Sequence, residues 1–177
     1  MKTTYQIDPA HSSAQFVIRH MMITNVRGGF TGVKGTVTWD PEHPADARIE
    51  AEIAADSLKT NDEQRDAHVK GPDFLDTAVF PAITFKSGKI APQGEGELSV
   101  TGELTIHGVT REIGLRVEGI TGEAKDLWGN SRIGASASTK IKRSDFGLLF
   151  NAPLETGGVL LGDELKLEIE VSLVKVS

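Results

Sequence analysis

Apolar and polar residues alternate along most of this chain, a pattern typical of antiparallel strands that bury one face. In SRIGASASTKI, residues 131–141, one face carries apolar or small side chains and the other carries charged and hydroxyl groups. The same period of two recurs in residues 13–23, 33–39, 47–53, 83–85, 98–106, 113–117 and 165–173. The pattern predicts eight long antiparallel strands, with a shorter one near Tyr5–Ile7.

One segment departs from this alternation and carries the signals of a helix. Thr60-Asn61-Asp62-Glu63 has the form of a capping box. A helix of about residues 61–70 would end at Gly71-Pro72, because glycine favours a helix C-terminus and proline cannot continue a helix. Apolar residues follow in the connection to the next strand, so we expect the helix and this loop to cover one end of the sheet.

Eight antiparallel strands with one apolar face close most economically into a barrel, because closure leaves no free sheet edge. A barrel of this size either fills its interior with side chains or holds one ligand. Several inward-facing positions are small: Gly35, Ala47, Ala51, Gly102, Ala135, Ala137 and Thr139. An unfilled space of about 300 Å³ would cost roughly 7 kcal/mol, against a typical total stability of about 5–15 kcal/mol. Either the sheet flattens to bring these residues together or an apolar molecule fills the lumen, and we favour the second.

Five stretches, spread over nearly the whole chain, carry a resemblance to a known family. They are HSSAQFVIRHMMITNVRGGF (11–30), NDEQRDAHVKGPDFLDTAVFPAITF (61–85), LTIHGVTREI (104–113), RIGASASTKIKRSDFG (132–147) and GDELKLEIEV (162–171). In this order they resemble the YceI-like proteins, also called polyisoprenoid-binding domains. The resemblance implies one domain over residues 1–177, an all-β, eight-stranded lipocalin-like barrel with the short helix over one end, and a homodimer. It also implies a long amphiphile in an apolar lumen, such as a polyisoprenoid, an isoprenoid quinone or a fatty acyl chain.

Composition limits the partners and the compartment. The net charge of −6 argues against nucleic acid, since nucleic-acid-binding surfaces concentrate Lys and Arg. The chain has no cysteine, which excludes disulfides, thiolate nucleophiles and Cys-ligated zinc. No run approaches the ~20 apolar residues of a membrane span, and MKTTYQID contains no apolar signal segment. We therefore expect no transmembrane segment and a cytoplasmic protein, or an exported one if a signal was trimmed.

Strand parity identifies the side chains expected to line the lumen or its mouth. They are Phe16, Ile18, His20, Met22, Phe74, Ile83, Phe85, Leu104, Leu115, Ala135, Ala137, Arg143 and Phe146. His20 and Arg143 are the polar members and are candidates to bind a ligand's head group. Two structural alternatives stay open: a core histidine bonded to a backbone carbonyl, and a buried arginine paired with Asp145 or another carboxylate.

Catalytic and metal-binding signals are weak. Asp8, His11, Ser12 and Ser13 supply the residue types of a hydrolytic triad, but in DPAHSS they are typical of a turn that enters a strand, and no G-x-S-x-G motif is present. The five histidines show no metal-ligand spacing. We predict a non-catalytic lipid carrier with no metal and no cofactor other than its bound lipid. The alternatives are a hydrolase or isomerase acting on an isoprenoid or acyl chain, and a structural barrel without ligand.

Overall fold

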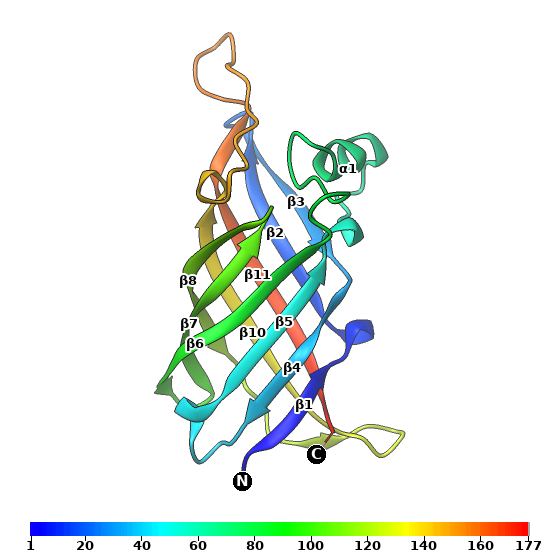
Figure 1. The fold of residues 1–177 in the computed structure, drawn as a ribbon, viewed down its shortest axis with the longest axis vertical. Coiled ribbons are helices and arrows are strands. Elements are labelled where there is room, and N and C mark those ends of the chain that lie inside the picture. Colours follow the sequence, from blue (N-terminus) through cyan, green and yellow to red (C-terminus); the bar gives the residue numbers. More distant parts are fainter. Residues whose placement is uncertain (177) are drawn as a thin grey trace.

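The computed structural model describes residues 1–176, which form a tall barrel with both termini at one end and a helix at the other (Figure 1). The strands are β1 (Thr3–Ile7), β2 (Ser13–His20), β3 (Thr24–Phe30), β4 (Val33–Trp39), β5 (Arg48–Ala54), β6 (Ala82–Gly94), β7 (Glu97–Ile106), β8 (Val109–Glu118), β9 (Ala124–Lys125), β10 (Ser131–Lys142) and β11 (Leu161–Lys175). The α-helix within these residues is α1 (Glu63–Lys70). Short 3₁₀ turns occur at Pro9–His11, Pro44–Asp46, Ala55–Ser57 and Arg143–Phe146.

The strands close into the predicted eight-stranded antiparallel barrel because two pairs of short strands each act as one. β1 and β2 both pair with β11, and β4 and β3 pair with them in turn. A 3₁₀ turn interrupts the first of these composite strands, and Thr31-Gly32 interrupts the second. The order then continues through β5, β6, β7, β8 and β10, which returns to β11. The fold class predicted from the alternation is confirmed.

The seams between the strands differ in length. β10 and β11 pair continuously from Arg132↔Val174 to Lys142↔Glu164. β8 and β10, by contrast, pair only from Ser136↔Glu118 to Ser138↔Arg116. Above this short ladder the Thr139 hydroxyl donates a hydrogen bond to the Gly114 carbonyl oxygen, 2.6 Å away. The long strand β11 therefore makes the most extensive pairing with β10, whereas the ladder between β8 and β10, which closes the barrel, is short.

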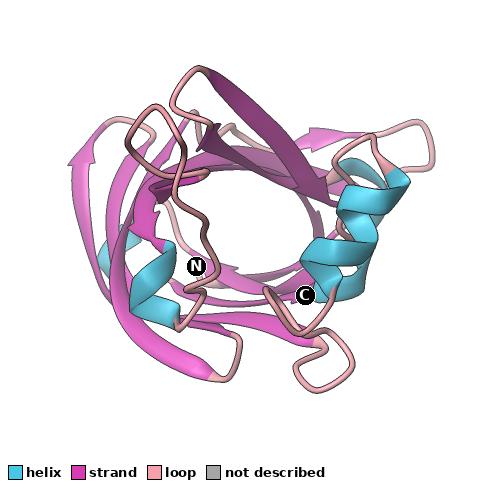
Figure 2. Ribbon diagram, turned by 90° about the horizontal axis from the view of Figure 1, so that it is seen from above, coloured by secondary structure: helices cyan, strands magenta, loops and turns pink. Residues whose placement is uncertain are grey.

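Helix α1 begins two residues later than the sequence predicted. Asp62 caps it by accepting a hydrogen bond from the Arg65 N–H at 3.0 Å. Asn61 has a φ of 64°, a left-handed conformation that cannot belong to a right-handed helix. The helix ends where the Gly71 N–H donates to the His68 carbonyl oxygen. Viewed along the barrel, α1 lies beside the opening, at its rim (Figure 2).

Within residues 1–176, no helix combines the length and the apolar character needed to cross a bilayer.

The buried core forms a shell around the barrel rather than a filled centre. Val100 and Leu58 are fully buried. In contrast, Leu165, Leu167 and Val171 face inward from β11 but are only half-buried. Inward-facing aliphatic side chains that stay accessible indicate an interior that the protein's own atoms do not fill.

Candidate ligand-binding cavity

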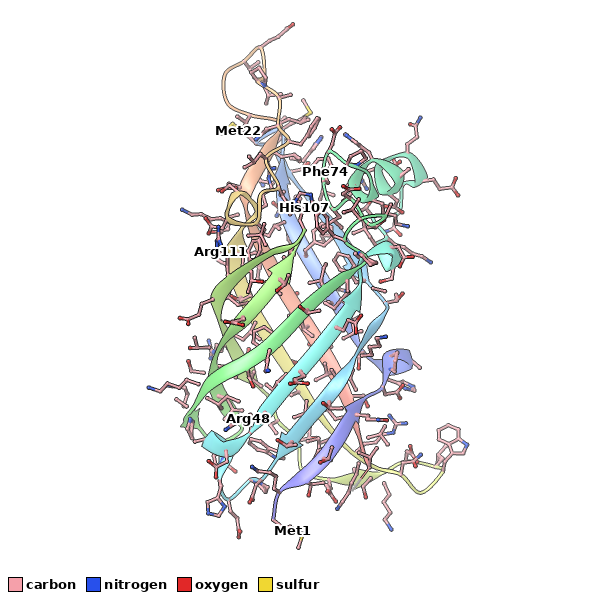
Figure 3. The ribbon with its side chains drawn as sticks, in the orientation of Figure 1. Met1, Met22, Arg48, Phe74, His107 and Arg111 are labelled. Atoms are coloured by element: carbon pink, nitrogen blue, oxygen red, sulfur yellow. The ribbon has the colours of Figure 1, made fainter. Side chains whose placement is uncertain are left out.

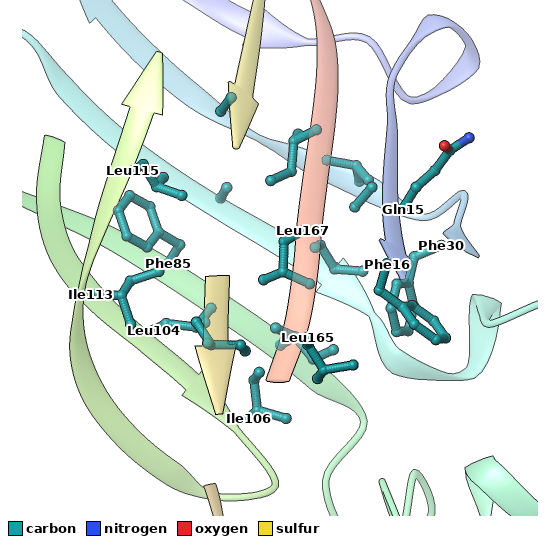
Figure 4. A pocket seen from close by; sticks show the side chains of 18 of the residues that line it. Gln15, Phe16, Phe30, Phe85, Leu104, Ile106, Ile113, Leu115, Leu165 and Leu167 are labelled. Carbon is teal, nitrogen blue, oxygen red and sulfur yellow. The ribbon is translucent and has the colours of Figure 1, made fainter. Parts of the chain in front are cut away.

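The barrel encloses an apolar cavity of about 390 Å³. Its wall is built from inward-facing side chains of all the strands that form the barrel, from Ile7 on β1 to Leu173 on β11. Figure 4 shows Phe85, Leu115 and Leu167 directed into a common space, whereas Gln15 points away from it. The period-two alternation is the cause, because every second side chain of each strand must point into the barrel.

Most of the residues singled out from the sequence lie in this wall. They are Phe16, Ile18, His20, Phe74, Ile83, Phe85, Leu104, Leu115, Ala135, Ala137 and Arg143. Ala135 and Ala137 face Val171 and Ile169 across the β10–β11 ladder, and Ala137 also faces Val117 on β8. Small side chains on β10 thus widen the lumen beside larger ones on β11. Their contact with a ligand remains a prediction.

Two expected lining residues lie elsewhere. Met22 was expected to continue the inward parity of its strand, but β2 ends at His20 and the chain reverses at Met21 and Met22. The Met22 side chain is 59% exposed at the tip of the β2–β3 hairpin. Phe146 was expected at the lumen or its mouth, but it belongs to the 3₁₀ turn after β10 and is 1% exposed within the core. Both corrections have the same cause, because strand parity does not extend beyond the end of a strand.

The structure adds lining residues that the sequence analysis did not select. On β11 these are Leu165, Leu167, Ile169 and Val171, whose alternation was recognised as a strand but not assigned to the site. On β3 they include Val26 and Phe30, and Phe150 comes from the loop after β10. The alternation of apolar and polar residues along β11 would have been sufficient to assign its four inward-facing residues to the site. Phe150 had no such signal, because its loop has no periodic pattern.

Three aromatic rings from separate segments gather at the helix end of the cavity. His68 comes from α1, Phe74 from the loop that follows it, and Phe150 from the loop between β10 and β11. Their ring centroids are 5.0–5.1 Å apart. His68 Nε2 lies 2.9 Å from an Asp73 carboxylate oxygen, which holds the imidazole in place. All three rings line the cavity, so this aromatic cluster forms its rim on the α1 side.

Arg143 holds the loop beside this rim through backbone carbonyls. Its Nε donates to the Gly162 carbonyl oxygen at 2.8 Å, and its Nη1 donates to those of Leu148 and Phe150 at 2.6 and 2.8 Å. Burial lowers the pKa of the Arg143 guanidinium, and the Asp163 carboxylate opposes this shift. The expected partner Asp145 accepts none of these bonds. Arg143 therefore positions the loop that carries Phe150 at the edge of the cavity.

Other polar groups of the wall also lie near α1. His20 is half-buried at the end of β2. Thr60, which is 3% exposed, donates from its hydroxyl to Asp66 at 2.6 Å and accepts from Arg65 Nε at 2.8 Å. The cavity thus joins a long apolar wall to one end that offers hydroxyl, imidazole and guanidinium groups. This arrangement suits a molecule with an apolar chain and a polar head.

The groups considered for other chemistry lie outside the cavity wall. His11 Nδ1 is 2.8 Å from Asp8 Oδ2, while the Ser12 hydroxyl accepts from the Ser172 N–H at 3.0 Å. Ser12 therefore ties the turn to β11 rather than pairing with His11. Asp40, Glu42 and His43 place ligand atoms within 4.8 Å of one another, near the end of β4. Asp40 there caps its own turn by accepting the Glu42 N–H, which lowers the pKa of Asp40 to about 2.

Proteins related in sequence cover most of the chain. The YceI-like domain model matches residues 5–173. A UPF0312 protein of Staphylococcus aureus is 36% identical over 167 residues, which cover 94% of this chain and 94% of that protein. A UPF0312 protein of Pseudomonas putida is 33% identical over 177 residues, covering 99% of this chain and 88% of the relative.

Solved structures share the barrel. BcnA of Burkholderia cenocepacia superposes with a TM-score of 0.82 at 25% identity, covering 94% of this chain and 98% of that one. The YceI protein of Campylobacter jejuni gives 0.75 at 33% identity, covering 90% of each chain. A polyisoprenoid binding domain from Saccharophagus degradans gives 0.70 at 15% identity, over 98% and 99% of the two chains, and so shares the fold alone. By sequence and by fold, this chain belongs to the YceI-like domain family.

Proposed function

We propose that this protein binds and carries a long-chain amphiphile without altering it chemically. The observation that carries this proposal is the apolar cavity of about 390 Å³ inside a closed barrel, with polar groups gathered near α1. At about 24 cal/mol per Å³, an apolar chain that fills this space would contribute up to roughly 9 kcal/mol of favourable free energy.

The length of the lumen limits how much of a ligand's apolar chain the barrel can enclose. From Leu165 to Leu173, β11 advances about 26 Å along its length, at roughly 3.3 Å per residue. With a strand tilt of about 40°, the corresponding axial length is about 20 Å. One leaflet of a bilayer core is about 15 Å thick, so the lumen can enclose one extended acyl chain or several isoprene units. A polyisoprenoid, an isoprenoid quinone or a fatty acid satisfies this limit.

The position of the polar groups sets the ligand's orientation. The apolar chain would lie along β10 and β11, with the head group near His20, Arg65 and His68 beside α1. Affinity would come mainly from burial of methylene groups, at ~0.8 kcal/mol each. Selection among ligands would then depend mostly on chain length and shape, with the polar end distinguishing head groups.

Mass spectrometry of an organic-solvent extract, beside native mass spectrometry of the intact protein, tests this proposal directly. We expect one long-chain lipid per chain in the wild-type protein and none in the Ala135→Phe, Ala137→Phe double variant purified in parallel. Geranylgeraniol and palmitate would then be titrated into lipid-free protein. If neither the extract nor the titrations show binding, the carrier function is wrong.

Recovery of the added ligand separates a carrier from an enzyme. A carrier returns geranylgeraniol or a palmitoyl ester chemically unchanged after prolonged incubation at micromolar protein. Conversion of either compound, lost in His20→Ala, would favour the hydrolase or isomerase alternative and would overturn the non-catalytic part of the proposal.

A further inference from the structure

The turn between β2 and β3 combines backbone strain with exposed apolar side chains. The Ile23 N–H donates to the His20 carbonyl oxygen at 3.1 Å, which closes a tight turn over Met21 and Met22. Both methionines have positive φ angles, 51° and 60°. Two positive angles at the central positions are the mark of a type I′ turn, where Asn-Gly is favoured and residues with larger side chains are disfavoured.

The side chains at this turn face solvent. Met21 is 42% exposed, Met22 59% and Ile23 69%. The neighbouring loop joins them: the Met21 N–H donates to the Leu160 carbonyl oxygen at 2.7 Å, and Val159 is 42% exposed. We call Met21, Met22, Ile23 and Val159 the apolar tip. Backbone strain together with exposed apolar side chains at one tip points to a contact with something outside the protein.

The apolar tip adjoins the polar end of the cavity. Figure 3 shows Met22 at the same end of the molecule as Phe74, opposite Met1. His20, the residue immediately before the tip, lines the cavity. The Gly158 backbone passes so close to the Met22 sulfur that a β-carbon there would collide with it. The tip is therefore a packed projection beside the cavity rim.

The two strands that carry the tip bear positive side chains in an otherwise acidic chain. Residues 9–39 contain no Asp or Glu, although the net charge of the protein is −6. Arg19 and Arg27 are exposed on the two strands that carry the tip. The Arg19 guanidinium donates to the Met22 carbonyl oxygen and to Asn25 Oδ1, both at 3.4 Å. The loop between β10 and β11 contains two carboxylates, Asp145 and Glu155, and Asp163 on β11 accepts hydrogen bonds from Ser144.

We propose that the apolar tip docks the cavity end of the barrel onto the surface of a bilayer that contains anionic lipid. A convex apolar projection fits the interface between head groups and acyl chains, where the arginine side chains can reach lipid phosphates. This docking goes beyond the proposed carrier function, and it can be tested without any cavity ligand. It would also place the cavity rim against the layer from which an amphiphile enters or leaves.

Co-sedimentation with large unilamellar vesicles of phosphatidylcholine and phosphatidylglycerol, mixed at about two to one, tests the docking. We expect the wild-type protein to bind, with weaker binding as salt rises. Met21→Asn with Met22→Gly should lower vesicle binding at least tenfold and at the same time raise the melting temperature, because it supplies the favoured turn residues. Ile23→Asn, which leaves both left-handed positions unchanged, should also weaken binding.

A matched control exists at the opposite end of the barrel. Leu127 and Trp128 are 94% and 79% exposed in the loop between β9 and β10, near both termini (Figure 1). Leu127→Asn with Trp128→Gly removes at least as much exposed apolar surface and should leave binding unchanged. The docking is refuted if wild-type protein does not sediment with the vesicles, or if the control pair loses binding while the tip variants keep it. Neither result bears on the lipid extract, so failure of docking and failure of the carrier function are distinguishable.

Discussion

Filling the lumen with protein atoms should abolish ligand binding while leaving the barrel folded. Ala135 and Ala137 are the positions for this test, because they line the cavity and pair with Val171 and Ile169 on the adjacent strand β11. Replacing both with Phe puts two rings in the path of an apolar chain. Exclusion of about five methylenes, at ~0.8 kcal/mol each, removes roughly 4 kcal/mol of binding free energy. That corresponds to about a thousandfold rise in Kd.

The same substitutions should not destabilise the lipid-free protein. Each part of the cavity that the rings fill is worth about 24 cal/mol per Å³, so we expect the free energy of unfolding in urea to stay equal or to rise. Binding is measured by the fluorescence of a polyene fatty acid, with geranylgeraniol as competitor. Ser138→Phe with Lys140→Phe places the same rings on the outer face of β10 and serves as the control. If the folded lumen variant binds within threefold of wild type, the proposed site is wrong.

Three further predictions follow from other contacts. Arg143→Met should lower the free energy of unfolding by about 3 kcal/mol in urea, because it leaves several buried carbonyl groups unpaired. Arg132 holds the pKa of Asp8 at about 2, with a smaller contribution from His11. Since the folded pKa lies below the unfolded value of about 3.9, this stabilisation is present above pH 4 and lost as the pH falls through about 2. In Arg132→Met the acid loss of stability should be shallower, as circular dichroism melts across this range would show. Phe150→Ala opens the aromatic cluster and should speed ligand dissociation in stopped-flow measurements, whereas Phe80→Ala, beside His107 outside the cavity wall, should not.

The parity of the strands could be predicted because it depends on neighbours in the sequence. Ile83, Leu104 and Leu115 lie in the cavity wall as their alternation indicated. Met22 could not be placed this way, because two methionines form a turn that normally needs Asn or Gly, and so the end of β2 carried no turn signal. The alternation predicted a strand at residues 33–39, which is β4, but none at residues 24–30, which form β3.

Contacts between distant segments were the part that the sequence could not supply. Arg143 was recognised as a buried inward residue, and a carboxylate was expected as its partner. The structure instead gives it the carbonyls of Leu148, Phe150 and Gly162, which the loop after β10 brings to it. Any residue type can offer a carbonyl oxygen, so no sequence pattern marks such a partner. The aromatic cluster at the rim has the same origin, since its members come from three segments.

The open lumen is compatible with a stable barrel because the stabilising contacts lie in its wall. Backbone ladders join β10 to β11 and β6 to β7 over most of their lengths, and Val100 is fully buried outside the cavity wall. None of these contacts needs a filled interior. The alanines of β10 keep the lumen wide beside the large aliphatic side chains of β11, which stay half-buried and so retain apolar surface for a ligand. Burying that surface is worth about 25 cal/mol per Å², and this free energy appears on binding instead of on folding. Under the proposed carrier function, this separation would let the barrel stay folded when the lumen empties.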